Sequence, residues 1–162
     1  LSSVILDLFT DKLGFLSKPK EDALAQKSCK DMNVKTASVE APVSTLSGGN
    51  QQKVVIGKWI ARQPKLFIMD APTVGIDVGS KAEIYDRIQY YASSGMAILL
   101  ISDEIEEVVL NCNRILVMAQ GEQIAFIDEA ERLACTPQAL EEKIMRLISE
   151  ATPSVQPVGG ES

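Results

Sequence analysis

The sequence has no histidine among its 162 residues and only three cysteines. Without an imidazole, the chain cannot build a Ser-His-Asp triad or a histidine metal site. Cys29, Cys112 and Cys135 lie far apart and form no CxxC pair, so the sequence predicts neither a disulfide framework nor a zinc site. This cysteine usage is typical of a reducing, cytoplasmic compartment.

Long apolar runs and an excess of positive charge are also missing. No run approaches the roughly 20 apolar residues that a membrane-spanning helix needs, and no signal segment opens the chain. The formal net charge of -6 argues against a nucleic-acid partner, because binding to phosphates needs a basic surface. Hydrophobic residues make up 46% of the chain, enough for one globular core. Any membrane role is therefore expected to be by association.

Three short apolar runs have the length of fully buried strands: residues 66–70, 96–102 and 114–118. Between the first two runs, Ile84, Ile88 and Tyr91 repeat at helical spacing, and Gly95 ends that helix. A strand, a helix and a second strand predict a parallel pair with a crossover helix. We therefore expect an α/β fold with a parallel sheet flanked by helices.

Other segments carry helix and turn signals. A helix is predicted over residues 17–33, with a serine cap and a proline in its first turn. The third apolar run leads into a hairpin that turns at Gln120 and Gly121. A last helix is predicted to begin with Thr136 as cap and Pro137 at its first position.

The stretch "LSGGNQQKV", residues 46–54, places two glycines at the start of a helical pattern. Glycines let the backbone approach a ligand closely, and a helix N-terminus presents N–H groups and a positive dipole end. The Ser47 hydroxyl can bond a phosphate oxygen, so the stretch is a candidate anion site. Taken alone, a capped turn with no ligand explains the same residues.

The stretch "KLFIMDAPTVGID", residues 65–77, sets four apolar residues before Asp70. A carboxylate at the C-terminal end of a buried strand lies where α/β sheets bind ligands, and it can hold Mg²⁺ directly or through water. A loop aspartate that ends a strand is the alternative interpretation.

Together these stretches resemble the signature motif, the Walker B strand and the D-loop of an ATP-binding-cassette (ABC) ATPase. The resemblance runs from about Gly14 to about Phe126 and is closest to the second cassette of the ATPases of bacterial ribose/galactose-type importers. It implies a partial ABC-ATPase, P-loop NTPase-like fold with a helical signature subdomain. It also implies that Asp70 binds Mg²⁺ and that Asp77 of the D-loop reaches across a cassette dimer. The implied signature contacts to a partner cassette's ATP are Ser47, Gly48, Gly49, Asn50 and Gln51.

Two departures from the family pattern affect hydrolysis. Ala71 stands where active cassettes carry the catalytic glutamate, and a methyl group cannot orient the attacking water. Asp103 stands where they carry a switch histidine, and a carboxylate there would repel a triphosphate. The Walker A pattern G-x-x-x-x-G-K-[ST] does not occur in the 162 residues. We therefore expect no complete catalytic centre and negligible ATPase activity from this chain alone.

The resemblance suggests four parts: a helical signature subdomain (1–62), an α/β core with the Walker B strand, D-loop and switch region (63–128), a C-terminal helix (129–150) and a disordered tail (151–162). The chain begins with Leu1 in a segment that reads as the interior of a domain, so we expect a fragment of a longer protein. Lacking the strands that precede the signature in a cassette, its parallel sheet would lack neighbours on one flank. We expect self-association, or a missing half supplied by another chain.

Two functional hypotheses follow. In the first, the chain is part of the ATP-binding subunit of a sugar importer, and its signature completes a composite ATP site. ATP and Mg²⁺ would then bind only in the assembled transporter, with a second cassette, permease subunits and, indirectly, a periplasmic sugar-binding protein as partners. The expected location is cytoplasmic, peripheral on the inner face of the membrane. In the second, the chain is a catalytically dead docking module.

Two other side chains of the signature helix are interpreted as structural. Lys53 is expected to be a solvated helix lysine rather than a phosphate ligand, and Trp59 to pack in the core.

Overall fold

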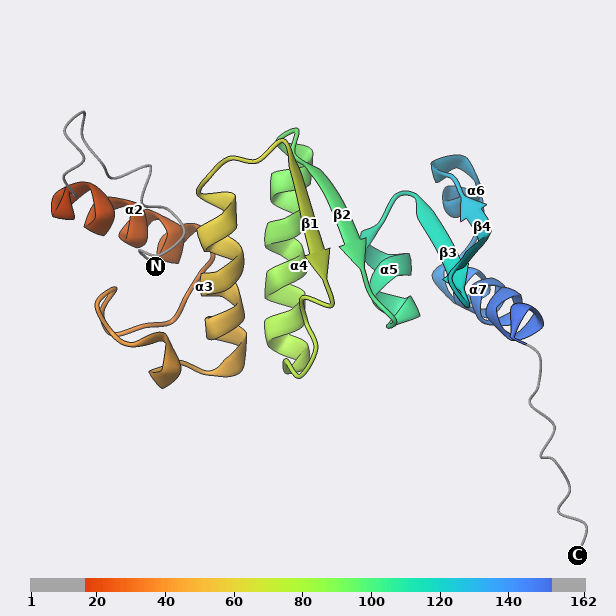
Figure 1. The fold of residues 1–162 in the computed structure, drawn as a ribbon, viewed down its shortest axis with the longest axis horizontal. Coiled ribbons are helices and arrows are strands. Elements are labelled where there is room, and N and C mark those ends of the chain that lie inside the picture. The colour runs from red at the N-terminus through yellow and green to blue at the C-terminus, as the bar shows by residue number, and fades with distance from the viewer. Residues whose placement is uncertain (1–16, 153–162) are drawn as a thin grey trace, which may run out of the picture. The chain divides into compact units, whose positions relative to one another are not determined.

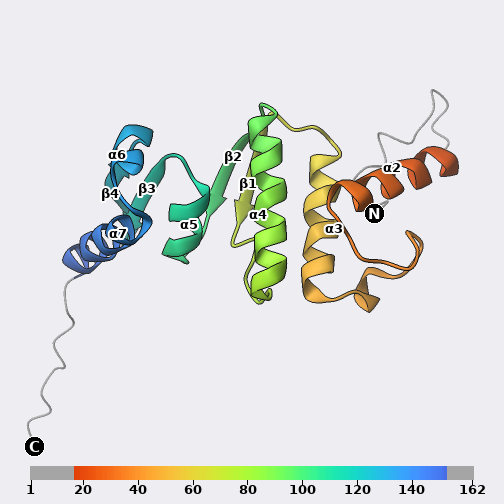
Figure 2. The ribbon, with the colours of Figure 1, turned by 180° about the vertical axis from the view of Figure 1, so that it is seen from behind.

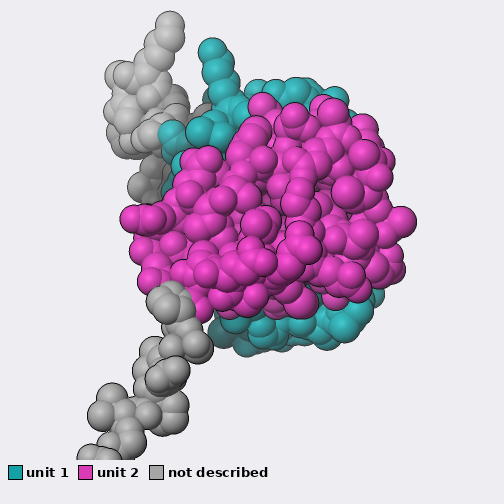
Figure 3. Space-filling view, turned by 90° about the vertical axis from the view of Figure 1, so that its right-hand side faces the viewer, with its two compact units in different colours: residues 1–101 teal, residues 102–162 magenta. Residues whose placement is uncertain are grey.

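The computed structural model describes residues 17–152, which form parts of two compact units, residues 1–101 and 102–162. Figure 1 labels the elements, and Figure 3 colours the atoms of each unit separately. The first unit contains α2 (Lys18–Asp31), the 3-10 helix η2 (Val43–Thr45), α3 (Gly48–Ile60), β1 (Leu66–Asp70), α4 (Val78–Ser93) and β2 (Ala97–Ile101). The second contains α5 (Ile105–Asn111), β3 (Ile115–Ala119), β4 (Glu122–Ile127), α6 (Glu129–Ala134) and α7 (Pro137–Ala151).

The two strands of the first unit pair in parallel, as the sequence predicts. Ile68 pairs with Leu99 and Asp70 with Ile101, and α4 is the crossover helix between the strands. α4 ends where predicted, because Gly95 follows it with a φ of +97°, a left-handed conformation that glycine adopts without strain. The α/β expectation is confirmed, with a two-stranded sheet in the described part of this unit.

α3 and α4 share the core of the first unit with one face of this sheet (Figures 1 and 2). The buried residues of this core are Met32, Ile56, Ile60, Met69, Ile84, Tyr85 and Ile88. The boundary expected between residues 62 and 63 therefore falls inside one compact unit, because the signature helix and the Walker B strand bury the same apolar surface. Trp59 is not part of that core: it is 45% exposed, so the prediction of core packing is wrong.

The opposite face of the β1–β2 sheet is exposed. Leu66 and Ile68 are 54% and 55% exposed, and Leu99 and Ile101 are 49% and 48% exposed. The expectation of fully buried strands is therefore wrong for this face. Side chains alternate between the two faces of a strand, and the core shared with α3 and α4 lies on the face that carries Met69.

The second unit is built on an antiparallel hairpin. β3 and β4 pair as predicted, and the turn residues Gln120 and Gly121 have φ values of 49° and 81°. One face of the hairpin packs with α5 and α7 around six buried residues: Val109, Ile115, Val117, Ile127, Leu140 and Ile144. The boundary expected between residues 128 and 129 thus falls inside this unit, where α7 shares the hairpin's core.

The C-terminal helix expected over residues 129–150 is two helices, α6 and α7. They are separated because Thr136 precedes a proline, which disfavours the helical conformation, and because its side chain accepts a bond from the N–H of Ala139 at 3.3 Å to cap α7. α7 continues to Ala151, one residue into the expected disordered tail. Thr152 is the C-cap residue of α7, and the rest of that tail, residues 153–162, lies outside the described residues. Between residues 17 and 152, no helix combines the length and apolarity that crossing a bilayer requires.

Candidate functional site

The N-terminal end of α3 reaches the surface. Ser47 is the N-cap residue and is exposed, as is Gly48 in the first turn of this 13-residue helix. The Ser47 side chain makes no capping bond to α3. With its cap residue and first residue exposed, α3 directs the positive end of its dipole at solvent, which favours an anion.

Asn50 links Ser47 to the loop that follows α2. Its Oδ1 accepts a hydrogen bond from the backbone N–H of Lys35 at 2.9 Å, and its Nδ2 donates to Ser47 Oγ, also at 2.9 Å. The next residue, Gln51, donates from Nε2 to the carbonyl of Leu46 at 2.8 Å. Both side chains therefore hold neighbouring parts of the chain, and their expected contact with nucleotide stays a prediction.

Gly49 is buried against α4. A Cβ at this position would lie 2.3 Å from Ser80 Oγ and 2.5 Å from Ser80 Cβ, closer than such atoms approach in proteins. At Gly48 the nearest atom, Ile76 Cδ1, would be 3.7 Å away, an ordinary contact. The second glycine of the motif therefore has a packing role: it lets α3 approach the first turn of α4.

Lys53 joins the same two helices one turn further along. Its residue is 2% exposed, its Nζ pairs with the carboxylate of Glu83 on α4, and it donates to the carbonyl of Asn33 at 3.4 Å. The expectation of a solvated lysine is wrong, because α3 turns this side chain toward α4 rather than toward solvent. The bond from Lys53 holds the pKa of Glu83 below its usual value.

Asp77 lies at the N-terminus of α4 and is exposed. Its Oδ1 accepts from the backbone N–H of Ser80 at 2.9 Å and so caps the helix. The bond from the Ser80 N–H lowers the pKa of this carboxyl. The structure thus gives the predicted D-loop acid a capping role within the chain, and its contact across a cassette dimer stays a prediction.

Asp70 ends β1 with an exposed side chain. Among the described residues, no three acidic, cysteine or histidine side chains are grouped to hold a metal ion. A single carboxylate fits a Mg²⁺ ion whose other ligands are phosphate oxygens and water. The next residue, Ala71, adopts a left-handed φ of +43° and donates its N–H to the carbonyl of Ile101 at 2.8 Å.

Asp103, the residue expected at the switch position, belongs to the second unit and is exposed just before α5. The neighbouring Ser102 forms two hydrogen bonds at the start of α5: its Oγ donates to the Glu107 carboxylate at 3.2 Å and accepts from the N–H of Glu104 at 3.1 Å. The described residues thus place a carboxylate, and no imidazole, at this position.

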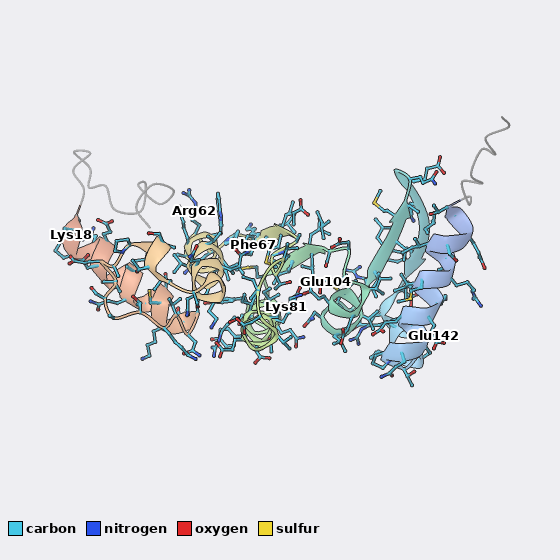
Figure 4. The ribbon with its side chains drawn as sticks, turned by 90° about the horizontal axis from the view of Figure 1, so that it is seen from below. Lys18, Arg62, Phe67, Lys81, Glu104 and Glu142 are labelled. Carbon is cyan, nitrogen blue, oxygen red and sulfur yellow. The ribbon has the colours of Figure 1, made fainter. Side chains whose placement is uncertain are left out.

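The site of the first unit is therefore built where two helices begin side by side (Figures 1 and 4). Ser47 and Gly48 lie at the start of α3, and Asp77 lies at the start of α4. The close contact between Gly49 and Ser80 brings the two helix starts together. Sequence reasoning found these three residues and missed Ser80. The Asp77–Ser80 spacing, typical of an N-cap, could have indicated it.

The fold of the chain is similar to that of solved ATP-binding cassettes. A nucleotide-free ATP-binding cassette from an ABC transporter superposes with a TM-score of 0.67 at 22% identity, covering 98% of this chain and 57% of that one. A dimeric post-hydrolysis structure of the ATP-binding cassette MJ0796 bound to ADP and Pi superposes with a TM-score of 0.63 at 21% identity, covering 75% of this chain and 52% of that one. The chain therefore has the fold of part of an ATP-binding cassette.

The sequence comparisons agree with this class. Residues 9–74 match the ABC transporter family. Over 136 residues the chain is 45% identical to a putative ribose/galactose/methyl galactoside import ATP-binding protein of Pseudomonas savastanoi pv. phaseolicola, covering 84% of this chain. The match covers 25% of that protein, so the chain spans about a quarter of the length of this relative. The family resemblance read from the signature and Walker B stretches is confirmed.

Proposed function

We propose that the chain supplies the signature motif to a composite ATP site in the ATP-binding subunit of a sugar importer. The observation that carries the proposal is the exposed start of α3, where Ser47 and Gly48 face solvent in a chain similar to sugar-import ATP-binding proteins. The dimeric cassette on which the chain superposes supports the view that two cassettes act together.

In this site the chain would bind the phosphates of ATP held by a second cassette. The Ser47 hydroxyl would donate to a phosphate oxygen, while the dipole of α3 stabilises the negative charge that develops as the terminal phosphate is transferred to water. The close approach of Gly49 to Ser80 would fix the separation between the first turns of α3 and α4. The second cassette would supply the phosphate-binding loop and the catalytic carboxylate.

The hydrolytic centre that this chain could form around its own Asp70 would be inactive. Asp70 would hold Mg²⁺ together with phosphate oxygens, and that ion would neutralise phosphate charge. Ala71 carries no group that can orient or deprotonate a water molecule. ATP turnover would therefore occur only in the assembled transporter, at the partner's side of the shared site.

The partners in this proposal are a second cassette, permease subunits and, through them, a periplasmic sugar-binding protein. The chain would work on the cytoplasmic face of the membrane. A second candidate function is a docking module that binds a partner without taking part in ATP turnover. The exposed apolar face of the β1–β2 sheet favours this alternative, since such a face is stable only when covered.

Mixing the chain with a cassette that has an intact Walker A motif tests the proposal. We expect ATP turnover to rise with added chain. The rise should disappear for Ser47→Arg, because the arginine side chain would occupy the space in front of the α3 N-terminus where the phosphate would bind. The matched control is Ser149→Arg, at an exposed serine on α7 of the second unit. No stimulation, or stimulation that Ser47→Arg leaves intact, would reject the shared site and favour the docking module.

A further inference from the structure

Asn50 has a fixed orientation in this structure. The backbone N–H of Lys35 can only donate, so the Asn50 atom that it meets at 2.9 Å must be the side-chain oxygen. The amide nitrogen therefore faces Ser47 Oγ, to which it donates at 2.9 Å. The position of one backbone group thus determines which end of the amide meets the serine.

This orientation determines what the Ser47 hydroxyl can still do. A hydroxyl has two acceptor lone pairs and one proton to donate. The Asn50 amide occupies one lone pair, and an N–H donor cannot receive the proton. The proton of the exposed Ser47 side chain is therefore left to be donated away from Asn50.

The loop after α2, whose Lys35 N–H bonds to Asn50, has a second attachment to α3. Lys53, one turn after Asn50, donates to the carbonyl of Asn33 at 3.4 Å and pairs with Glu83 of α4. Asn33 and Lys35 are thus bound by two side chains of α3 that are three residues apart. This second attachment keeps the Lys35 N–H in place to orient the amide.

We propose that Asn50 is a positioning residue, which holds the Ser47 hydroxyl as an acceptor so that its proton is donated to a phosphate oxygen. The inference rests on the proposed function and replaces the sequence-based prediction for Asn50: this residue acts through Ser47 and does not itself contact the nucleotide. Of the two residues, only Ser47 bonds the ligand.

Asn50→Asp separates this role from a direct contact. Aspartate has the shape of asparagine and can still accept from Lys35, but its second oxygen cannot donate. It would accept the Ser47 proton and turn the hydroxyl inward, away from the phosphate. The hydrogen bond from Ser47 to the charged phosphate would then be lost. We expect this loss to lower stimulated ATP turnover by about tenfold or more.

The added charge is controlled by Gln52→Glu, which places a carboxylate two residues further along α3 with no bond to Ser47. We expect Asn50→Asp to lower stimulated turnover much more than Gln52→Glu does. In a Ser47→Ala background, the effect of Asn50→Asp should shrink to that of Gln52→Glu, since the hydroxyl through which Asn50 acts is gone. An equal effect of Asn50→Asp in both backgrounds, or no effect, would overturn the proposal.

Nuclear magnetic resonance of the ¹⁵N-labelled 162-residue chain tests the hydrogen bonds without ATP or a partner. We expect Ser47→Ala to shift the side-chain NH₂ signals of Asn50, and Asn50→Ala to increase the exchange rate of the Lys35 amide with solvent. Asn50 signals that do not respond to Ser47→Ala would overturn the positioning role even if turnover is stimulated. If the unsubstituted chain stimulates no turnover while these signals respond, the shared site fails and the orientation of Ser47 stands.

Discussion

Lys53 of α3 and Glu83 of α4 form an ion pair in which the lysine side chain is 3% exposed and the glutamate side chain 39% exposed. The two partners are thus solvated very unequally. Removing the buried partner leaves a carboxylate that water can solvate, whereas removing the exposed partner leaves a buried cation without its counter-charge. The pair connects the helix of the signature motif to the helix that follows the D-loop.

This asymmetry predicts the order of two substitutions. Glu83→Gln should lower the thermal unfolding midpoint more than Lys53→Met, although lysine is the more buried residue. Thermal unfolding followed by circular dichroism measures both midpoints. A larger loss for Lys53→Met would show that the contacts of the lysine stem outweigh its charge.

Close packing at Gly49 gives a second prediction. Gly49→Ala should destabilise the first unit by about 1 to 3 kcal/mol, because the new methyl group meets Ser80 and forces the helices apart. Gly48→Ala is the matched control, since its methyl group would have only an ordinary contact with Ile76. Urea unfolding measures both. Ser80→Gly should restore part of the stability lost in Gly49→Ala, and equal stabilities of the two alanine variants would contradict the packing role.

The contrast between these contacts and the helices themselves shows what the sequence could predict. β1, α4, the Gln120–Gly121 turn and the Thr136 cap depend on residues close together in the chain, and all were predicted. The Lys53–Glu83 pair joins residues 30 positions apart, and no local pattern marks it.

For the site, too, the local features could be predicted and the contacts between distant residues could not. Ser47, Gly48 and Asp77 were indicated by the resemblance of their motifs to those of ABC ATPases, and they lie at the starts of two neighbouring helices. The burial of Gly49 and the link from Asn50 to Lys35 depend on how α3 packs against α4 and the loop after α2, which periodicity does not determine. The exposed sheet face was missed for a related reason, since an apolar run does not show which of its faces a helix covers.

A third prediction concerns pH. The pKa of Asp77 is lowered in the folded state from the usual value of 3.8, so its cap contributes stability above that value and loses it as pH falls through the lower folded pKa. Asp77→Asn keeps a capping oxygen but cannot titrate. The stability difference between the unsubstituted chain and this variant should therefore shrink from pH 7 to about pH 3.

Urea unfolding of the unsubstituted chain and of the Asp77→Asn variant at both pH values measures this difference. Glu129→Gln, in the first turn of α6, serves as the control for general effects of removing a carboxylate. A difference that stays constant with pH would show that the Asp77 charge makes no contribution to the cap.

The exposed sheet face predicts the association state of the isolated chain. We expect it to self-associate through Leu66, Ile68, Leu99 and Ile101, since a parallel sheet is stable when both faces are covered. Ile68→Lys combined with Leu99→Lys should lower the apparent mass, because these neighbouring residues would place two charges on the face. Size-exclusion chromatography with light scattering measures it. A monodisperse monomer of the unsubstituted chain would contradict this expectation.

Sedimentation of the chain with a hydrolysis-deficient cassette that retains Walker A would show whether Ser47 at the start of α3 binds ATP held by a second cassette. We expect a complex that forms with Mg-ATP, is absent without nucleotide and is lost for Ser47→Arg but not for Ser149→Arg. A complex of equal stability with and without ATP, or one that Ser47→Arg leaves unchanged, would contradict it.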